Sequence, residues 1–158
     1  IGAYGNDDGG SGSGISYLLL SSSLDSTSEI DLGDADYTFV GESSSDRSGV
    51  TVGFAGDVDG DLLEDVLVGS DWDDDGGTNA GKAYLVLSSS LAGSSNIDLV
   101  DADYAFTGEV ASDYAGYALS GAGDVDGNGL SDLLVGAYSN DDNGAVAGKA
   151  YLLLTPDE

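Results

Sequence analysis

The sequence predicts an all-β fold built from repeated units of four antiparallel strands, and two observations support this prediction. First, the chain matches itself when it is shifted by 67 residues, so that YLLLSSSL at residues 17–24 aligns with YLVLSSSL at residues 84–91. Second, short runs rich in Val, Leu, Tyr, Phe and Ala alternate with clusters of Gly, Asp, Ser and Asn, which is typical of strands and turns. The 158 residues hold about 2.4 such repeats.

The central repeat is complete, and its apolar runs predict four strands, each bounded by turn residues. They are expected at residues 49–55, 65–69, 82–87 and 104–108. By the phase of the repeat, the opening copy supplies only the last three strands and the closing copy only the first three. These six are expected at residues 1–3, 15–20, 37–41, 116–122, 132–136 and 149–154. The total is ten strands, and helices are disfavoured throughout.

The strands group into a partial blade at residues 1–41, a complete blade at 49–108 and a partial blade at 116–154. Four short antiparallel strands at a fixed spacing are typical of a β-propeller blade, and an open stack of sheets is the alternative architecture. Propellers commonly close with about four to eight blades. We therefore expect either a fragment of a longer protein or a subunit that associates through its incomplete blades.

The charge of the chain is extreme, because 30 acidic residues face only Arg47, Lys82 and Lys149, for a net charge of −27. Such a surface repels nucleic acid and anionic membranes, so we expect neither as a partner, and cations are the natural ligands. No apolar run approaches the roughly 18 residues of a membrane span. Because cysteine and histidine are absent, disulfides, thiolate metal sites and the usual general base are excluded, and no catalytic residue is expected.

Two acidic loops recur at the same phase of the repeat, GDVDGDLLED at residues 56–65 and GDVDGNGLSD at residues 123–132. Oxygen donors stand at relative positions 1, 3, 5 and 9, and a curled loop points alternate side chains inward. With the backbone carbonyl at position 7, each loop offers the oxygen-rich shell that Ca²⁺ prefers. The predicted calcium ligands are Asp57, Asp59, Asp61, Leu63 and Asp65 in the first loop, and Asp124, Asp126, Asn128, Leu130 and Asp132 in the second.

Other interpretations of these loops are weaker. Asp-Gly pairs are good turn formers, but a turn needs only one such pair, whereas four donors recur in both copies. Magnesium prefers few carboxylates, several waters and a strict octahedron. Zinc favours His or Cys, which the chain lacks. We therefore predict two calcium sites.

The stretches YALSGAGDVDGNGLSDLLVGAY at residues 117–138 and AGKAYLLL at residues 147–154 resemble the FG-GAP repeats of the integrin α-subunit propeller and its bacterial relatives. The resemblance covers essentially the whole chain. It implies a propeller, with seven blades in many members, and calcium loops in the hairpin between the first and second strands of a blade. It does not imply a particular ligand.

The chain departs from the family pattern at several positions. Leu62 stands where the family usually has glycine, so the first loop is expected to bend differently or to bind calcium more weakly, whereas Gly129 matches in the second loop. Asn128 replaces an aspartate, which removes a charge and keeps an oxygen. Tyr138 takes the place of the usual proline.

Connections in an antiparallel meander alternate between the two ends of a sheet, so the calcium loops should share one end with the loops at residues 21–36 and 88–103. The other end carries the loop at residues 70–81, where Trp72 lies among aspartates. Trp72, Asp73 and Asp75 are the candidate ligand-binding residues, because an aromatic ring beside carboxylates can stack a sugar or a cationic group. The competing interpretation is a solvated acidic loop.

These features predict a calcium-stabilised segment at the cell surface or outside the cell that binds a protein or carbohydrate ligand in adhesion. A structural subunit of a surface layer or fibre, assembled through incomplete blades, is the alternative, since unpaired strand edges can accept a neighbour's strand. A non-catalytic part of a secreted hydrolase is a further alternative.

Overall fold

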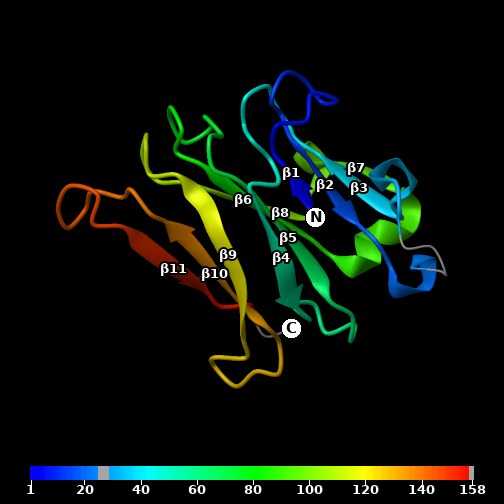
Figure 1. Cartoon of the computed structure of the whole chain (residues 1–158). Helices are drawn as coiled ribbons and strands as arrows, with labels where there is room; N and C mark the ends of the chain where they lie inside the picture. Colours follow the sequence, from blue (N-terminus) through cyan, green and yellow to red (C-terminus); the bar gives the residue numbers. More distant parts are fainter. Residues whose placement is uncertain (25–28, 157–158) are drawn as a thin grey trace.

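The computed structural model describes residues 1–24 and 29–156 and shows an all-β protein (Figure 1). Part of the predicted first blade and of the predicted loop at residues 21–36, namely residues 25–28, lies outside the described residues. Helical structure in the described residues is limited to four short 3₁₀ segments, η1 (Ser21–Ser23), η2 (Leu32–Asp34), η3 (Ser88–Gly93) and η4 (Leu99–Asp101). None of them could cross a bilayer.

The first sheet pairs strands from two different repeats. β1 (Gly2–Ala3), β2 (Ile15–Leu18) and β3 (Tyr37–Val40) form an antiparallel meander. On the outer edge of β3 lies β7 (Asn96–Asp98), which comes from the second repeat and runs parallel to β3. The outermost strand of the first sheet is therefore supplied by the second repeat.

The second and third sheets are antiparallel meanders. In the second sheet, β4 (Thr51–Gly56), β5 (Asp65–Ser70), β6 (Lys82–Val86) and β8 (Tyr104–Thr107) lie in the order of the chain. In the third sheet, β9 (Ala115–Gly123), β10 (Asp132–Ala137) and β11 (Lys149–Leu153) follow the same order. Each of the ten predicted strands corresponds to an observed strand, and β7 is the additional one. Its position shows that an outer loop also contributes to a sheet.

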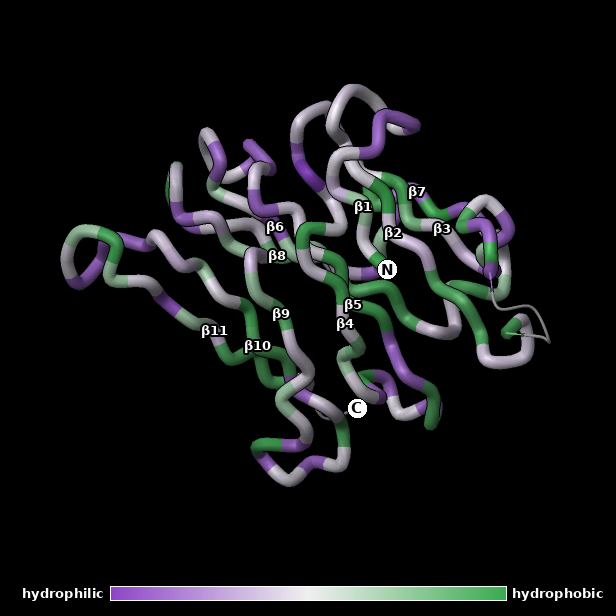
Figure 2. Tube along the Cα trace, in the orientation of Figure 1, coloured by the Kyte–Doolittle hydropathy of each residue, from purple (hydrophilic) through white to green (hydrophobic). Residues whose placement is uncertain are grey.

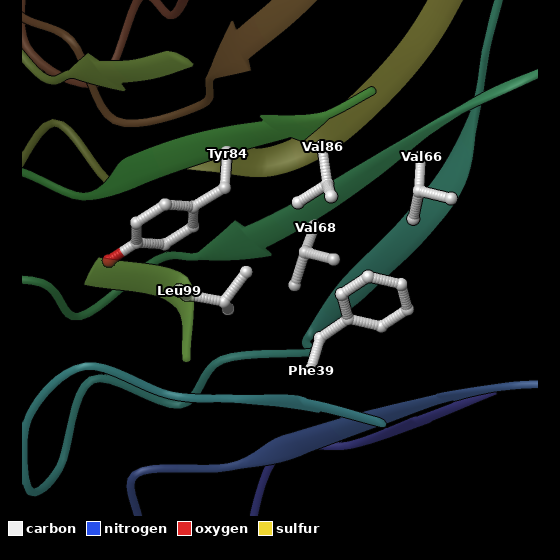
Figure 3. Close-up of a cluster of buried hydrophobic side chains, with 6 residues drawn as sticks. All are labelled: Phe39, Val66, Val68, Tyr84, Val86 and Leu99. Carbon is white, nitrogen blue, oxygen red and sulfur yellow. The ribbon is translucent and has the colours of Figure 1, made fainter. Parts of the chain in front are cut away.

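The three sheets pack face to face through two apolar clusters, and hydrophilic loops lie at both ends of the strands (Figure 2). The first cluster lies between the first and second sheets and contains Phe39, Val66, Val68, Tyr84, Val86 and Leu99 (Figure 3). The second lies between the second and third sheets and contains Ala55, Val58, Leu67, Leu85 and Leu133. Stacked sheets that share cores in this way have the architecture of neighbouring propeller blades.

Glycine allows the sheets to approach each other at equivalent points of both junctions. A Cβ atom on Gly2 would lie 2.0 Å from the carbonyl oxygen of Gly49, and one on Gly69 would lie 2.1 Å from that of Gly116. Both pairs are related by the 67-residue period. A side chain at either position would force the sheets apart, so the repeat of the sequence is also a repeat of the packing.

Candidate metal centres

Both acidic loops lie at the same end of the stacked sheets, the lower end in Figure 1. The loop at residues 57–64 joins β4 to β5, and the loop at residues 124–131 joins β9 to β10. Each hairpin loop is short, so all of its aspartates lie between the end of one strand and the start of the next. The position of these aspartates between two paired strands therefore keeps their carboxylates close together in the second and third sheets.

The first loop is folded around its own carboxylates. The N–H groups of Gly60 and Leu62 donate to the two oxygens of Asp57, at 2.7 and 3.0 Å. Asp59 accepts a hydrogen bond from the N–H of Asp61, and Asp61 accepts one from the N–H of Leu63, at 3.1 and 2.8 Å. These bonds curl the backbone and turn the carboxylates of Asp57, Asp59 and Asp61 towards one another.

The second loop repeats this pattern. The N–H groups of Gly127 and Gly129 donate to Asp124 at 2.7 and 2.9 Å. The N–H of Leu130 donates to Asn128 Oδ1 at 2.8 Å, so the asparagine keeps the role of an oxygen acceptor in the turn. The two loops thus have the same local geometry despite their different sequences.

Leu62 does not change the bend of the first loop, so that part of the expectation was wrong. Its φ is 70°, close to the 93° of Gly129, and both residues are in the left-handed region. The side chain of Leu62 is 88% exposed, so it meets no steric obstacle. The hydrogen bonds to Asp57 hold a conformation that costs a leucine about 1–2 kcal/mol.

The oxygen donors of each loop lie close enough together to surround one ion. In the first loop, one carboxylate oxygen from each of Asp57, Asp59 and Asp61 lies within 4.8 Å of the others. In the second loop, the same holds for Asp124, Asp126 and Asp132. The donor sets consist of hard oxygens without nitrogen or sulfur, and they fit Ca²⁺ in chemistry and in number once carbonyls and waters complete the shell. The carbonyls of Leu63 and Leu130 stay predicted ligands.

Asp65 and Asp132 occupy equivalent, fully buried positions at the start of the second strand of each blade. Asp65 accepts from the N–H groups of Val58 and Ser88 at 2.9 and 2.8 Å, and lies outside the close group of the first loop. Burial raises the pKa of Asp65, whereas hydrogen bonds from Thr155 and Val125 lower the pKa of Asp132. Both side chains anchor the loop to the sheet, and Asp132 is also placed to reach an ion.

The candidate ligand residues lie at the opposite end of the sheets, in the loop between β5 and β6. The guanidinium of Arg47 lies between two aromatic rings, 4.6 Å from the centre of Trp72 and 4.8 Å from that of Tyr4. Trp72 remains 42% exposed. Its ring therefore already stacks on a cation of this chain and remains partly accessible to solvent.

Asp73 and Asp75 are held by the amino group of Lys82. Asp73 is buried and lies 3.3 Å from Lys82 Nζ, and Asp75 forms a hydrogen bond with the same atom. Glu42 from the connection after β3 is a third partner, at 2.9 Å. Burial lowers the pKa of Lys82, but the hydrogen bonds to Asp75 and Glu42 outweigh it and raise the pKa overall. This ion cluster links the first and second sheets.

A related cluster occurs at the junction of the second and third sheets. Lys149 Nζ lies 2.7 Å from both Glu109 and Asp142. The ring of Tyr138 lies 5.2 Å from that of Tyr114 and 4.7 Å from that of Tyr117. Exposed aromatic rings thus gather at this end of both junctions.

Sequence reasoning placed the loop at residues 88–103 at the same end as the acidic loops but missed its contacts with the first of them. The hydroxyl of Ser88 donates to Asp61 Oδ2 at 2.7 Å, and that of Ser89 to Asp59 Oδ2 at 3.3 Å. Thr155 stands at the equivalent place in the third sheet, where its N–H donates to Asp132 at 2.9 Å. The recurrence of SSSL after the third strand was the available signal, because hydroxyl side chains at a repeated phase suggest a repeated contact.

Comparisons with known proteins agree with the repeat and its loops. The FG-GAP repeat family model matches residues 115–153, which span the third sheet and its acidic loop. The chain is 34% identical over 116 residues to integrin alpha pat-2 of Caenorhabditis elegans and 34% identical over 102 residues to integrin alpha-PS2 of Drosophila melanogaster. These alignments cover 73% and 64% of this chain, but only 9% and 7% of the relatives.

The predicted resemblance is therefore confirmed, and these matches together with the stacked sheets support an FG-GAP, integrin α-like domain of propeller-like blades. It spans less than a tenth of the length of the relatives that it matches.

Proposed function

We propose that the chain is a calcium-binding segment of an adhesion or ligand-binding protein at the cell surface or outside the cell, and that the calcium is structural. The observation that carries this proposal is the pair of acidic loops, which have the same hydrogen-bond geometry and each bring three carboxylates together. Outside the cell, calcium is abundant enough to fill sites with dissociation constants of about 10⁻⁴ to 10⁻³ M.

When bound, calcium would neutralise the mutual repulsion of the carboxylates in each loop. The residues of the chain do the rest: backbone N–H groups orient Asp57 and Asp124, while Asp65 and Asp132 tie the loops to the sheets. Because the unfolded chain cannot present this arrangement, binding energy becomes folding energy. We assign the segment a binding role and no catalytic one.

Calcium is expected to raise the melting temperature. Free calcium at tenfold the dissociation constant contributes about 1.4 kcal/mol per site, so two sites should raise the Tm by about 5 °C or more over the chelated protein. Differential scanning calorimetry with excess EDTA and with 10 mM calcium measures this. A Tm that is the same in both conditions would contradict the proposal.

The first loop offers a matched pair of variants. Asp59→Asn removes a carboxylate of the close group, whereas Glu64→Gln removes the same charge from an exposed residue of the same loop. Isothermal titration calorimetry should show one weakened site for Asp59→Asn and two intact sites for Glu64→Gln. Equal losses in both variants would mean that the loop attracts calcium only through its net charge.

For the ligand we propose the end of the sheets opposite the calcium loops, where Trp72, Tyr117 and Tyr138 are each exposed by more than 40%. Aromatic rings beside Arg47 and several carboxylates suit a protein or carbohydrate partner. The ion clusters at Lys82 and Lys149 would hold the loops of this surface in place.

A further inference from the structure

Residues 88–101 form a continuous segment, here called the strap, that runs from the first acidic loop to the outer edge of the first sheet. It consists of η3, β7 and η4, and it is the yellow-green segment beside β3 in Figure 1. The strap belongs to the second repeat by sequence but to the first sheet by its hydrogen bonds. The strap thus contacts both the first acidic loop and the outer strand of the neighbouring blade.

The first two residues of the strap donate hydrogen bonds to three carboxylates of the first loop. The N–H of Ser88 donates to Asp65 Oδ1 at 2.8 Å, and its hydroxyl donates to Asp61 Oδ2 at 2.7 Å. The hydroxyl of Ser89 reaches Asp59 Oδ2 at 3.3 Å. All three acceptors are predicted calcium ligands, so the two serines contact the side chains that an ion would fix.

The backbone part of this anchoring recurs in the third sheet, whereas the hydroxyl there binds a different carboxylate. Both the N–H and the hydroxyl of Thr155 donate to Asp132 Oδ1, at 2.9 and 3.3 Å. The carbonyl of Thr155 accepts a hydrogen bond from Asn128 Nδ2 at 2.7 Å. A hydroxyl residue one period after Ser88 therefore holds the equivalent positions of the second loop.

The strap ends in the junction between the first and second sheets. The N–H of Thr38 donates to the carbonyl of Ser95 at 2.8 Å, and its hydroxyl donates to Asn96 Oδ1 at 2.7 Å. Leu99, which is 1% exposed, packs in the cluster that holds Phe39 of the first sheet and Tyr84 of the second (Figure 3). Movement of the strap would therefore open a core that two blades share.

We propose that the strap couples calcium binding in the first loop to the closure of the junction between the first and second sheets, with Ser88 and Ser89 as positioning residues. This inference rests on the proposed calcium function. An ion that fixes Asp59 and Asp61 also fixes the oxygens that the two hydroxyls bind, so the start of the strap becomes more ordered. By linkage, a closed strap must raise calcium affinity by the same factor.

Hydrogen exchange of the wild-type chain with and without calcium tests the coupling. The amide of Thr38 reports on the strap, because it donates to the carbonyl of Ser95. The amide of Tyr17 is the reference, because it donates to the carbonyl of Ile1 in the same sheet, on the side away from the strap. Calcium should slow exchange at Thr38 about 10-fold more than at Tyr17. An equal effect at both amides would mean only global stabilisation and would overturn the inference.

The double variant Ser88→Ala/Ser89→Ala removes both hydroxyls. We expect calcium affinity to fall about 10-fold, in line with the usual loss of an outer-shell partner, and the extra protection of Thr38 to fall to within twofold of Tyr17 at saturating calcium. The control is Ser90→Ala, whose hydroxyl donates to Asp103 at 2.7 Å rather than to the acidic loop. It should keep both the affinity and the extra protection.

The two proposals fail in different ways. If calorimetric titration shows no calcium binding to the wild type, the calcium function is wrong and the coupling is wrong with it. If calcium binds but the double variant keeps the extra protection of Thr38, the calcium function stands and the role of the two serines is overturned.

Discussion

The two junctions between sheets differ at Asn140, whose equivalent one repeat earlier is Asp73. In the second junction, Asn140 donates from Nδ2 to Asp113 Oδ2 at 2.8 Å, and both side chains are buried. In the first junction, the equivalent residues are Asp73 and Asp46, two buried carboxyl groups. An ionised Asp73 cannot donate such a bond. Burial and the charge of Asp73 accordingly raise the pKa of Asp46 from 3.8 to about 6.

The raised pKa of Asp46 predicts a dependence of stability on pH. The folded chain holds this proton at pH values where the unfolded chain has lost it, so the contribution to the unfolding free energy is complete below pH 3.8 and is lost as the pH rises through about 6. Asp73→Asn should lower the pKa of Asp46 by about 1 unit, which by itself raises the unfolding free energy at pH 7 by about 1 kcal/mol, while the loss of the ion pair with Lys82 acts in the opposite direction.

Carbon-13 NMR titration of the Asp46 carboxyl and urea unfolding at pH 7 measure these effects. Asp74→Asn is the control, because Asp74 is exposed and carries the same charge one residue away. An Asp46 pKa near 3.8 in the wild type would disprove the argument.

At the scale of elements, the strands show which secondary structure can be predicted from the sequence pattern and which cannot. Alternating apolar runs between turn residues identify β4, β5 and β6, because each pairs with a neighbour in sequence. β7 has only the three residues Asn-Ile-Asp between serines and a 3₁₀ turn, and its partner β3 lies in the previous repeat. A short parallel pair between distant segments leaves no local pattern, so it could not be predicted.

The importance of the strap as an element is testable through Leu99. Leu99→Ala removes a fully buried side chain from the shared core and should lower the free energy of unfolding by about 3 kcal/mol. Val100→Ala is the control, since Val100 is adjacent and 59% exposed, and its effect should stay below about 0.5 kcal/mol. Urea denaturation compares the two variants. Similar losses would show that the strap does not support the core.

At the scale of the whole molecule, the repeat predicted the common end of the acidic loops, because a fixed period places equivalent loops at equivalent places. The repeat did not predict which side chains contact one another at the junctions between sheets. The partners of Lys82 and Lys149 lie on two successive blades, and Arg47 stacks on Tyr4 from one repeat and Trp72 from the next. Contacts of this kind depend on how far the sheets rotate and slide, which no single repeat encodes.

The net charge of −27 gives a prediction for the whole chain. Most carboxylates lie outside the two acidic loops, and their repulsion opposes the compact state. In excess EDTA, raising NaCl from about 0.1 to 1 M shortens the Debye length from about 10 to about 3 Å, so the Tm should rise by about 5 °C. At pH 3.5, where many carboxyl groups are protonated, the same salt increase should have a much smaller effect. A Tm that does not change with salt at pH 7 would show that the surface charges are already too well separated to destabilise the fold.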